Sequence, residues 1–292
     1  MTIAAAFRCE GGVILCADTE VSGGELKESE EKIRLEKFQK SGMLVAVALA
    51  GWADLGKMLI ADLFSRLREL TSEKATEPIV INLIVAELEK FHRRHVFKHP
   101  QFGYPYGPSV TLLLAINYPG SGQVSMLYTN ETAVNRFSLY KAIGAGAPFA
   151  TNIIKPLSYS FLATMMTTKN VMLLATHVLY QVKKYVPTCG GNSSFLMVKN
   201  DGFFGQVGEF NLNSPAAYSE TFERIIAELF YASADLDLND TQVCIGLNLT
   251  ETRIAEIRHQ QRKEKERRAE LQKTLELPPV QHDPRFMPHW KR

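Results

Sequence analysis

The feature that most constrains the fold is a pair of apolar runs at the start of the chain, separated by a Gly-Gly dipeptide. Residues 2–7 and 13–18 both suit strands, so the glycines between them predict a tight β-hairpin. Thr2 heads the first strand directly after the initiator methionine, and Asp18 ends the second. Thr2 has two interpretations. It is either a small residue that happens to follow methionine or, once methionine is removed, a nucleophile whose own α-amino group can accept the hydroxyl proton.

The rest of the apolar pattern alternates strands with pairs of helices. A second hairpin is expected through Ser22-Gly23-Gly24, and a Pro- and Gly-rich loop over residues 98–108. Further strands are expected at residues 32–35, 44–50, 110–116 and 124–128, and helices at about 54–70, 81–91, 148–165 and 170–185. This order predicts an α+β fold, a four-layer αββα sandwich of two antiparallel sheets between helix layers.

Five short motifs stand in a fixed order along the chain. They are Gly11-Gly12-Val13-Ile14 leading to Ala17-Asp18, Lys32-Ile33, Ala50-Gly51 with Asp54, Gly144-Ala145-Gly146, and Cys189-Gly190-Gly191 followed by Asp201-Gly202. At this spacing they resemble the catalytic β-type subunits of the proteasome core and their bacterial proteasome-like relatives. Those proteins are N-terminal-nucleophile (Ntn) threonine hydrolases, and the resemblance covers roughly residues 2–210 and implies the Ntn hydrolase fold.

The resemblance implies a peptidase mechanism at the N-terminus. Thr2 is the expected nucleophile, with its amine as the general base. Lys32 would favour ionisation of the Thr2 hydroxyl, and Asp18 would hold Lys32 and balance its charge. The backbone N–H of Gly51 is the expected donor to the oxyanion.

The same resemblance implies a pocket for the residue before the scissile bond. Its expected lining is Val21, Leu49 and Ala53, with Glu30 and Arg34 near its mouth. An apolar floor with charged walls leaves the preference of this pocket open.

Three positions depart from the family pattern. Ala145, Val186 and Cys189 stand where the family has polar residues beside the amine of the nucleophile. Replacement of these polar residues is what sequence drift could produce after a subunit has lost its activity. Two alternatives to a threonine peptidase therefore stay open: a non-catalytic ring subunit or scaffold, and an Ntn amidase that acts on small amides.

The expected partners follow from the resemblance as well. They are peptide or unfolded protein substrates, further copies of the chain in a homo-oligomeric ring, and an ATPase or other regulator. No cofactor is expected. His92, His95 and His99 have a spacing that could hold a metal, but the surrounding basic residues would repel a divalent ion, so no metal site is predicted.

Composition bounds the remaining choices. The chain has 292 residues, 46% of them hydrophobic, enough for a large core. No apolar run approaches the roughly 18 residues of a membrane span, and the start lacks the basic region of a signal peptide. The four cysteines show no CxxC spacing. We therefore expect a cytoplasmic protein that makes no membrane contact.

The end of the chain differs in character from the rest. Residues 251–273 are densely charged, and several prolines interrupt residues 274–292. We therefore expect a domain over residues 1–250 and an extension over residues 251–292, made of a charged helix and then a Pro-rich tail. A last strand is expected at about 243–249. Glutamates intersperse the basic residues of the extension, so no nucleic-acid partner is predicted.

Overall fold

The computed structural model describes residues 2–23, 26–102, 107–161 and 167–207, together with scattered helical positions between 223 and 270. The chain divides into two compact units, Met1–Ser219 and Glu220–Arg292. All the strands and helices whose bounds are described belong to the first unit. The predicted boundary near residue 250 stays a prediction, and the strand expected at 243–249 lies outside the described residues.

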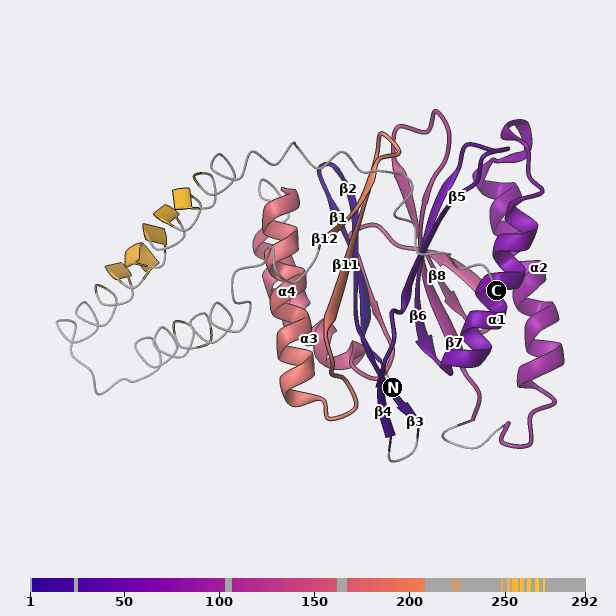
Figure 1. Cartoon of the computed structure of the whole chain (residues 1–292), viewed down its shortest axis with the longest axis horizontal. Coiled ribbons are helices and arrows are strands. Elements are labelled where there is room, and N and C mark those ends of the chain that lie inside the picture. The colour runs from indigo at the N-terminus through magenta and orange to yellow at the C-terminus, as the bar shows by residue number, and fades with distance from the viewer. Residues whose placement is uncertain are drawn as a thin grey trace. The chain divides into compact units, whose positions relative to one another are not determined.

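Two five-stranded antiparallel sheets form the centre of the first unit (Figure 1). The first sheet has the order β10-β1-β2-β11-β12 and the second the order β5-β6-β7-β8-β9, while β3 and β4 form a separate hairpin. The bounds in the first sheet are Tyr140–Ile143, Ala4–Cys9, Gly12–Asp18, Ser193–Lys199 and Phe204–Val207. Those in the second are Ile33–Lys37, Leu44–Gly51, Val110–Asn117, Val124–Asn130 and Ala133–Arg136, and the hairpin comprises Glu20–Gly23 and Leu26–Ser29.

The two predicted hairpins are confirmed, with one extension. β1 pairs with β2 from Ala4 opposite Ala17 to Cys9 opposite Gly12. In the second hairpin, the second strand, β4, is set in register by its pairing with β3 and not by an apolar face of its own. Strands β9 and β10 are short and were not predicted.

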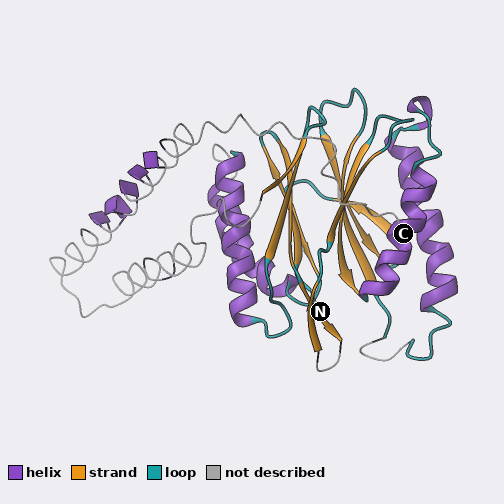
Figure 2. Ribbon diagram, in the orientation of Figure 1, coloured by secondary structure: helices purple, strands orange, loops and turns teal. Residues whose placement is uncertain are grey.

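Four α-helices flank the sheets (Figure 2): α1 (Ala53–Leu67), α2 (Glu77–Phe91), α3 (Ala147–Phe161) and α4 (Thr168–Tyr185). A short 3₁₀ turn, η1 (Ser72–Lys74), follows α1, and a π turn, η2 (His92–Val96), follows α2. The first helix ends before the predicted Leu70. All four predicted helices are present, since their amphipathic spacing gives each one apolar face to bury.

Strand β6 shows how the sheets are buried on both faces. Val45, Val47 and Leu49 point into a core shared with α1 and α2. The alternate residues, Leu44 and the alanines that follow it, belong to a core that also holds residues of β1 and β2. Alternation of side chains along a strand sends successive residues to opposite faces, so a continuous apolar run fits a strand covered on both sides.

Strand β1 repeats this arrangement in the first sheet. Ile3, Ala5 and Phe7 pack in a core with residues of α3 and α4, whereas Ala4 and Ala6 face the core shared with the second sheet. The chain is therefore a mixed α and β protein of antiparallel sheets, as predicted. None of the described helices combines the length and the apolar character needed to cross a membrane.

Candidate active site

Thr2 lies just before β1 and is held by the turn that follows β10. Only 5% of the residue is exposed. Gly146 N donates to the Thr2 carbonyl oxygen at 3.3 Å. Gly144 has a φ of +91°, and a Cβ at this position would lie 2.2 Å from the same oxygen. A glycine at Gly144 is thus required both by its backbone conformation and by the close approach of Thr2.

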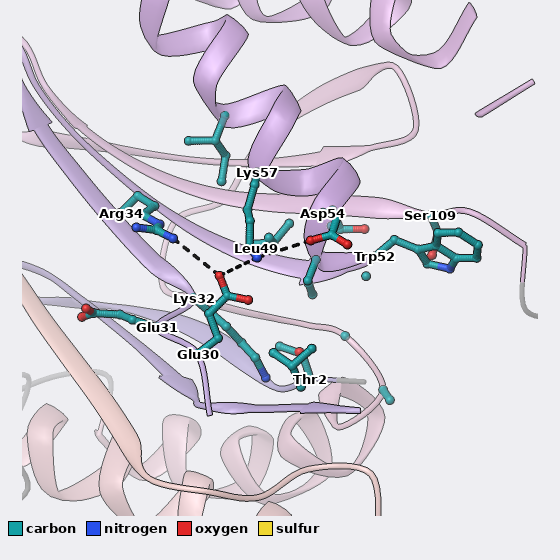
Figure 3. Close-up of a pocket in the computed structure, with 18 of the residues that line it drawn as sticks. Thr2, Glu30, Glu31, Lys32, Arg34, Leu49, Trp52, Asp54, Lys57 and Ser109 are labelled. Carbon is teal, nitrogen blue, oxygen red and sulfur yellow. Dashed lines mark hydrogen bonds and ion pairs between the residues drawn. The ribbon is translucent and has the colours of Figure 1, made fainter. Parts of the chain in front are cut away.

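Asp18 and Lys32 form a buried ion pair behind Thr2. Lys32 Nζ donates to Asp18 Oδ1 at 2.7 Å and to the Glu20 carbonyl oxygen at 2.5 Å. The two carboxylate oxygens of Asp18 also accept from backbone N–H groups, Oδ1 from Ile3 at 3.1 Å and Oδ2 from Gly190 at 3.0 Å. The carboxylate therefore ties the start of β1 to the Gly190 turn and fixes the lysine beside Thr2 (Figure 3).

The ionisation of Asp18 is a balance of opposing effects. Burial raises the pKa of its carboxyl above the ordinary value, while the Lys32 ammonium and the N–H groups of Gly190 and Ile3 act in the opposite direction. The charge of Asp18 therefore depends on Lys32. Removing the lysine would leave a carboxyl that favours its neutral form.

Gly51 ends β6, and the backbone hydrogen bonds of Leu49 and Trp52 indicate the direction of its N–H. Leu49 N donates to Lys32 O at 3.1 Å on the β5 side, and Trp52 N donates to Ser109 O at 2.9 Å on the β7 side. Because N–H groups along a strand alternate between its two neighbours, the Gly51 N–H faces the β5 side. The pairing of β5 with β6 ends at Ile33, opposite Ala48, so β5 offers no carbonyl at this level. The N–H is directed to the side on which Lys32 lies.

The predicted site residues meet at one cavity of about 850 Å³. Six of the seven line it: Thr2, Val21, Lys32, Leu49, Gly51 and Ala53. Asp18 lies behind Lys32 and is fully buried. The structure thus brings these residues together, and the catalytic or binding role of each stays a proposal.

The mouth of the cavity is charged, and both residues expected there are present. Glu30 and Arg34 line the cavity and lie 3.6 Å apart, Oε1 to Nη2. Three further charged residues, Glu31, Asp54 and Lys57, were not predicted to line it. Asp54 and Lys57 have an i,i+3 spacing in the first turns of α1, which could have indicated a shared helix face.

Other lining residues come from a segment that sequence alone did not connect to the site. Gly107, Ser109 and Thr111 reach the cavity because β7 pairs with β6, with Val110 opposite Gly51. Trp52 also lines the cavity and packs edge-on against His99, with ring centroids 4.9 Å apart. No sequence signal links these positions, because the contact arises only when the sheet forms.

The structure describes all three positions that depart from the family pattern. Ala145 lines the cavity. Cys189 is 3% exposed, and a Cβ on Gly146 would lie 3.1 Å from its sulfur. Burial raises the pKa of the Cys189 thiol to about 11, and the charge of Asp18 acts in the same direction. Val186 caps α4 and packs against the apolar core. This side of the site is therefore less polar than the resemblance implies.

Comparison with known proteins gives the fold. No protein-family model matches the chain, and no curated protein matches it. Among solved structures, Anbu (ancestral beta-subunit) from Yersinia bercovieri has a TM-score of 0.62 at 14% identity, covering 77% of this chain and 97% of that one. An Anbu (Gly-1) mutant from Hyphomicrobium sp. strain MC1 gives 0.62 at 13% identity, covering 78% and 97%. The helical assembly of the Anbu complex from Pseudomonas aeruginosa gives 0.61 at 12% identity, covering 81% and 98%.

These similarities correct the expectation of a proteasome β-type subunit. The chain has the fold of Anbu, which is proteasome-related but distinct from that subunit. The reason lies in what the sequence motifs do. Gly144 admits the Thr2 carbonyl, and Asp18 pairs with Lys32. Both are local contacts, and motifs this short do not by themselves distinguish the Anbu fold from that subunit.

Proposed function

We propose that this chain is an N-terminal-nucleophile hydrolase that cleaves peptide bonds with Thr2, exposed by removal of Met1. The observation that carries the proposal is the placement of Thr2 at a cavity beside the buried Lys32–Asp18 pair. The likeness in fold to Anbu supports it. The proposal includes the four-layer αββα architecture, for which the cores on both faces of β1 and β6 are the support.

The proposed reaction begins with attack of Thr2 Oγ on the peptide carbonyl carbon while the Thr2 amine takes the hydroxyl proton. Lys32 stabilises the developing charge on Oγ, and Asp18 keeps Lys32 in place. The oxyanion that forms on the carbonyl accepts a hydrogen bond from Gly51 N–H, a contribution of roughly 3 kcal/mol in comparable sites.

The tetrahedral intermediate then collapses. The C–N bond breaks, the proton held by the Thr2 amine passes to the leaving nitrogen, and an ester to Thr2 remains. A water molecule attacks that ester, the amine takes its proton, and the acid product leaves with Oγ reprotonated. Each cycle thus consumes one water and restores the free amine.

We extend the proposal to the assembly and its setting. One similar structure is a helical assembly of the Anbu complex, which supports self-association of this chain as well. The proposed substrates are peptides or unfolded proteins, and an ATPase or other regulator is a proposed partner. A cytoplasmic location belongs to the same proposal.

A second candidate function has an observation of its own. Ala145, Val186 and Cys189 make the surroundings of Thr2 less polar, which suits a ring subunit or scaffold that has lost activity. The retained Lys32–Asp18 pair argues against it. A buried ion pair costs free energy of desolvation, and here it adjoins a cavity and not a structural core alone.

One experiment separates the two functions. We expect the intact mass of the purified protein to lack Met1, and fluorogenic peptides to be cleaved by this protein but not by Thr2→Ala. Thr2→Ser is the matched control, since it keeps a hydroxyl nucleophile. Retention of Met1 on essentially all molecules, or equal rates for the protein and Thr2→Ala, would leave the scaffold function.

A further inference from the structure

Four charged side chains at the mouth of the cavity form a continuous series of ion pairs (Figure 3). Arg34 Nη2 lies 3.6 Å from Glu30 Oε1, and Lys57 Nζ lies 2.9 Å from the same oxygen. Lys57 Nζ also lies 3.4 Å from Asp54 Oδ1. The two carboxylates are thus matched by two cations, and the series as a whole carries no net charge.

The series crosses the mouth from one element to another. Glu30 precedes β5, Arg34 belongs to β5, and Asp54 and Lys57 belong to the first turns of α1. Lys57 is the link, because it contacts the acids on both sides. Its hydrogen bond to Glu30 raises the pKa of the Lys57 ammonium, so it is charged at neutral pH.

Two other charged residues, Lys32 and Glu31, belong to the lining. Lys32 is paired with Asp18. Glu31 Oε1 accepts a hydrogen bond from Gln206 at 2.7 Å, and Figure 3 shows the Glu31 side chain directed away from Thr2. The four-residue series is therefore balanced within itself, and the charge of Glu31 lies on the side directed away from Thr2.

Beyond the mouth, the cavity is lined by Val21, Leu49, Ala53 and Ile60. A charged side chain placed among them would lose its hydration and find no opposite charge that is free to pair with it. Such desolvation is costly in free energy. An apolar side chain would gain from the same surroundings.

We propose that the Arg34–Glu30–Lys57–Asp54 series, balanced in its own charges, selects an apolar side chain before the scissile bond, with Lys57 as the specificity-determining residue. This inference rests on the proposed function, because it concerns the same cavity. Without Lys57, the series has a net charge of one unit negative. Without the Glu30 charge, the series has one unit positive. The two substitutions should shift the preference in opposite directions.

The test measures binding in a Thr2→Ala background, so that it does not depend on hydrolysis. Three labelled peptides with amide-capped ends differ only in the final residue, which is Leu, Lys or Glu, and their affinities are measured by fluorescence anisotropy. We expect Leu to bind best to the parent. Lys57→Met should improve the affinity of the Lys peptide by about tenfold, and Glu30→Gln should improve that of the Glu peptide by about tenfold.

Matched controls remove a charge elsewhere on the surface. Lys40→Met and Glu10→Gln change exposed residues that do not line the cavity, and they should leave the order of the three peptides unchanged. Asp54→Asn is a second variant, expected to shift the preference toward Glu as Glu30→Gln does. An unchanged order in Lys57→Met and Glu30→Gln, or no binding of any peptide, overturns the inference. Binding with the expected order but no hydrolysis by the Thr2 protein overturns the proposed function alone.

Discussion

Asp18 and Lys32 are buried ionisable side chains, so each depends on the other for compensation of its charge. Asp18 is fully buried and Lys32 is 6% exposed. Breaking such a pair by removing one partner typically costs about 3–5 kcal/mol, because the remaining charge is left buried. The remaining group escapes part of that cost when it can become neutral. For Asp18 this means taking up a proton.

The first prediction follows from that proton. In Lys32→Met, the pKa of Asp18 should rise further, since burial already raises it and the opposing effect of Lys32 is lost. A carboxyl whose pKa is higher in the folded state binds its proton on folding, so stability is present at low pH and lost as pH rises. The melting temperature of Lys32→Met should therefore fall between about pH 4 and pH 7 more steeply than that of the parent protein.

The matched control for this prediction is the double variant Lys32→Met with Asp18→Asn. It keeps the shape of the site and removes the titrating carboxyl, so the steeper slope should disappear. Equal slopes for the parent protein and Lys32→Met would show that Asp18 is not charged by its partnership with Lys32. Both variants should also lose peptide hydrolysis, although only Lys32→Met shows the steeper pH dependence of the melting temperature. The two measurements thus separate the electrostatic role of Lys32 in hydrolysis from its effect on stability.

At the scale of the element, the start of α1 is fitted to the cavity by a glycine. Gly56 is buried in the first turns of the helix, and a Cβ there would lie 2.2 Å from Leu49 Cδ1. Leu49 belongs to the core under α1 and also lines the cavity. The contact between Gly56 and Leu49 therefore sets how close the helix lies to the cavity floor.

This contact allows a prediction in which two effects oppose each other. Alanine at position 56 would favour the helix by about 1 kcal/mol over glycine. Overpacking against Leu49 costs about 1–3 kcal/mol, so we expect Gly56→Ala to be less stable than the parent protein by up to about 2 kcal/mol in urea unfolding. Ser65→Ala, at an exposed position of the same helix, should lie within about 0.5 kcal/mol of the parent. A stabilised Gly56→Ala would mean that Leu49 moves aside freely.

The elements were largely predictable from the sequence, and the reasons differ between strands and helices. The run at residues 44–50 predicts β6 because both of its faces are buried, and the spacing of apolar residues predicts α1, α2, α3 and α4. Strands β9 and β10 were missed since their residues gain their conformation from a paired neighbour. The π turn His92–Val96 was also missed, because one extra residue in a helical turn leaves no mark on the apolar pattern.

At the scale of the whole molecule, only those site residues that belong to a short sequence motif were predictable. Thr2, Asp18, Lys32 and Gly51 carry signals in short segments of sequence. Lys57 and Ser109 carry none, since they come to the cavity through the packing of α1 and the pairing of β6 with β7. The family assignment failed for a related reason. The short motifs mark local contacts, and the comparison of whole structures directed the assignment to the Anbu fold.

The last prediction concerns the extension from Glu251 onward. All the buried residues of the three described hydrophobic cores precede Lys199, and the described positions between 251 and 270 are exposed. A segment so densely charged has too few apolar residues to join a core. A chain that ends at Thr250 should therefore keep the melting temperature of the full chain and the proposed Thr2 activity. Circular dichroism and peptide hydrolysis, compared side by side for the two chains, measure this.

Size-exclusion chromatography of the same two chains tests whether the extension takes part in assembly. A charged helix on the surface of a subunit can select neighbouring copies through ion pairs even where it adds little stability. An equal particle size would mean that residues 251–292 are dispensable for assembly, and a smaller particle would assign them to it. A truncated chain that does not fold would contradict the prediction and place the domain boundary later, because residues up to about 250 would then need the extension to bury their apolar side chains. Adding back the extension as far as residue 273 would test that outcome, since it restores the charged segment without the Pro-rich tail.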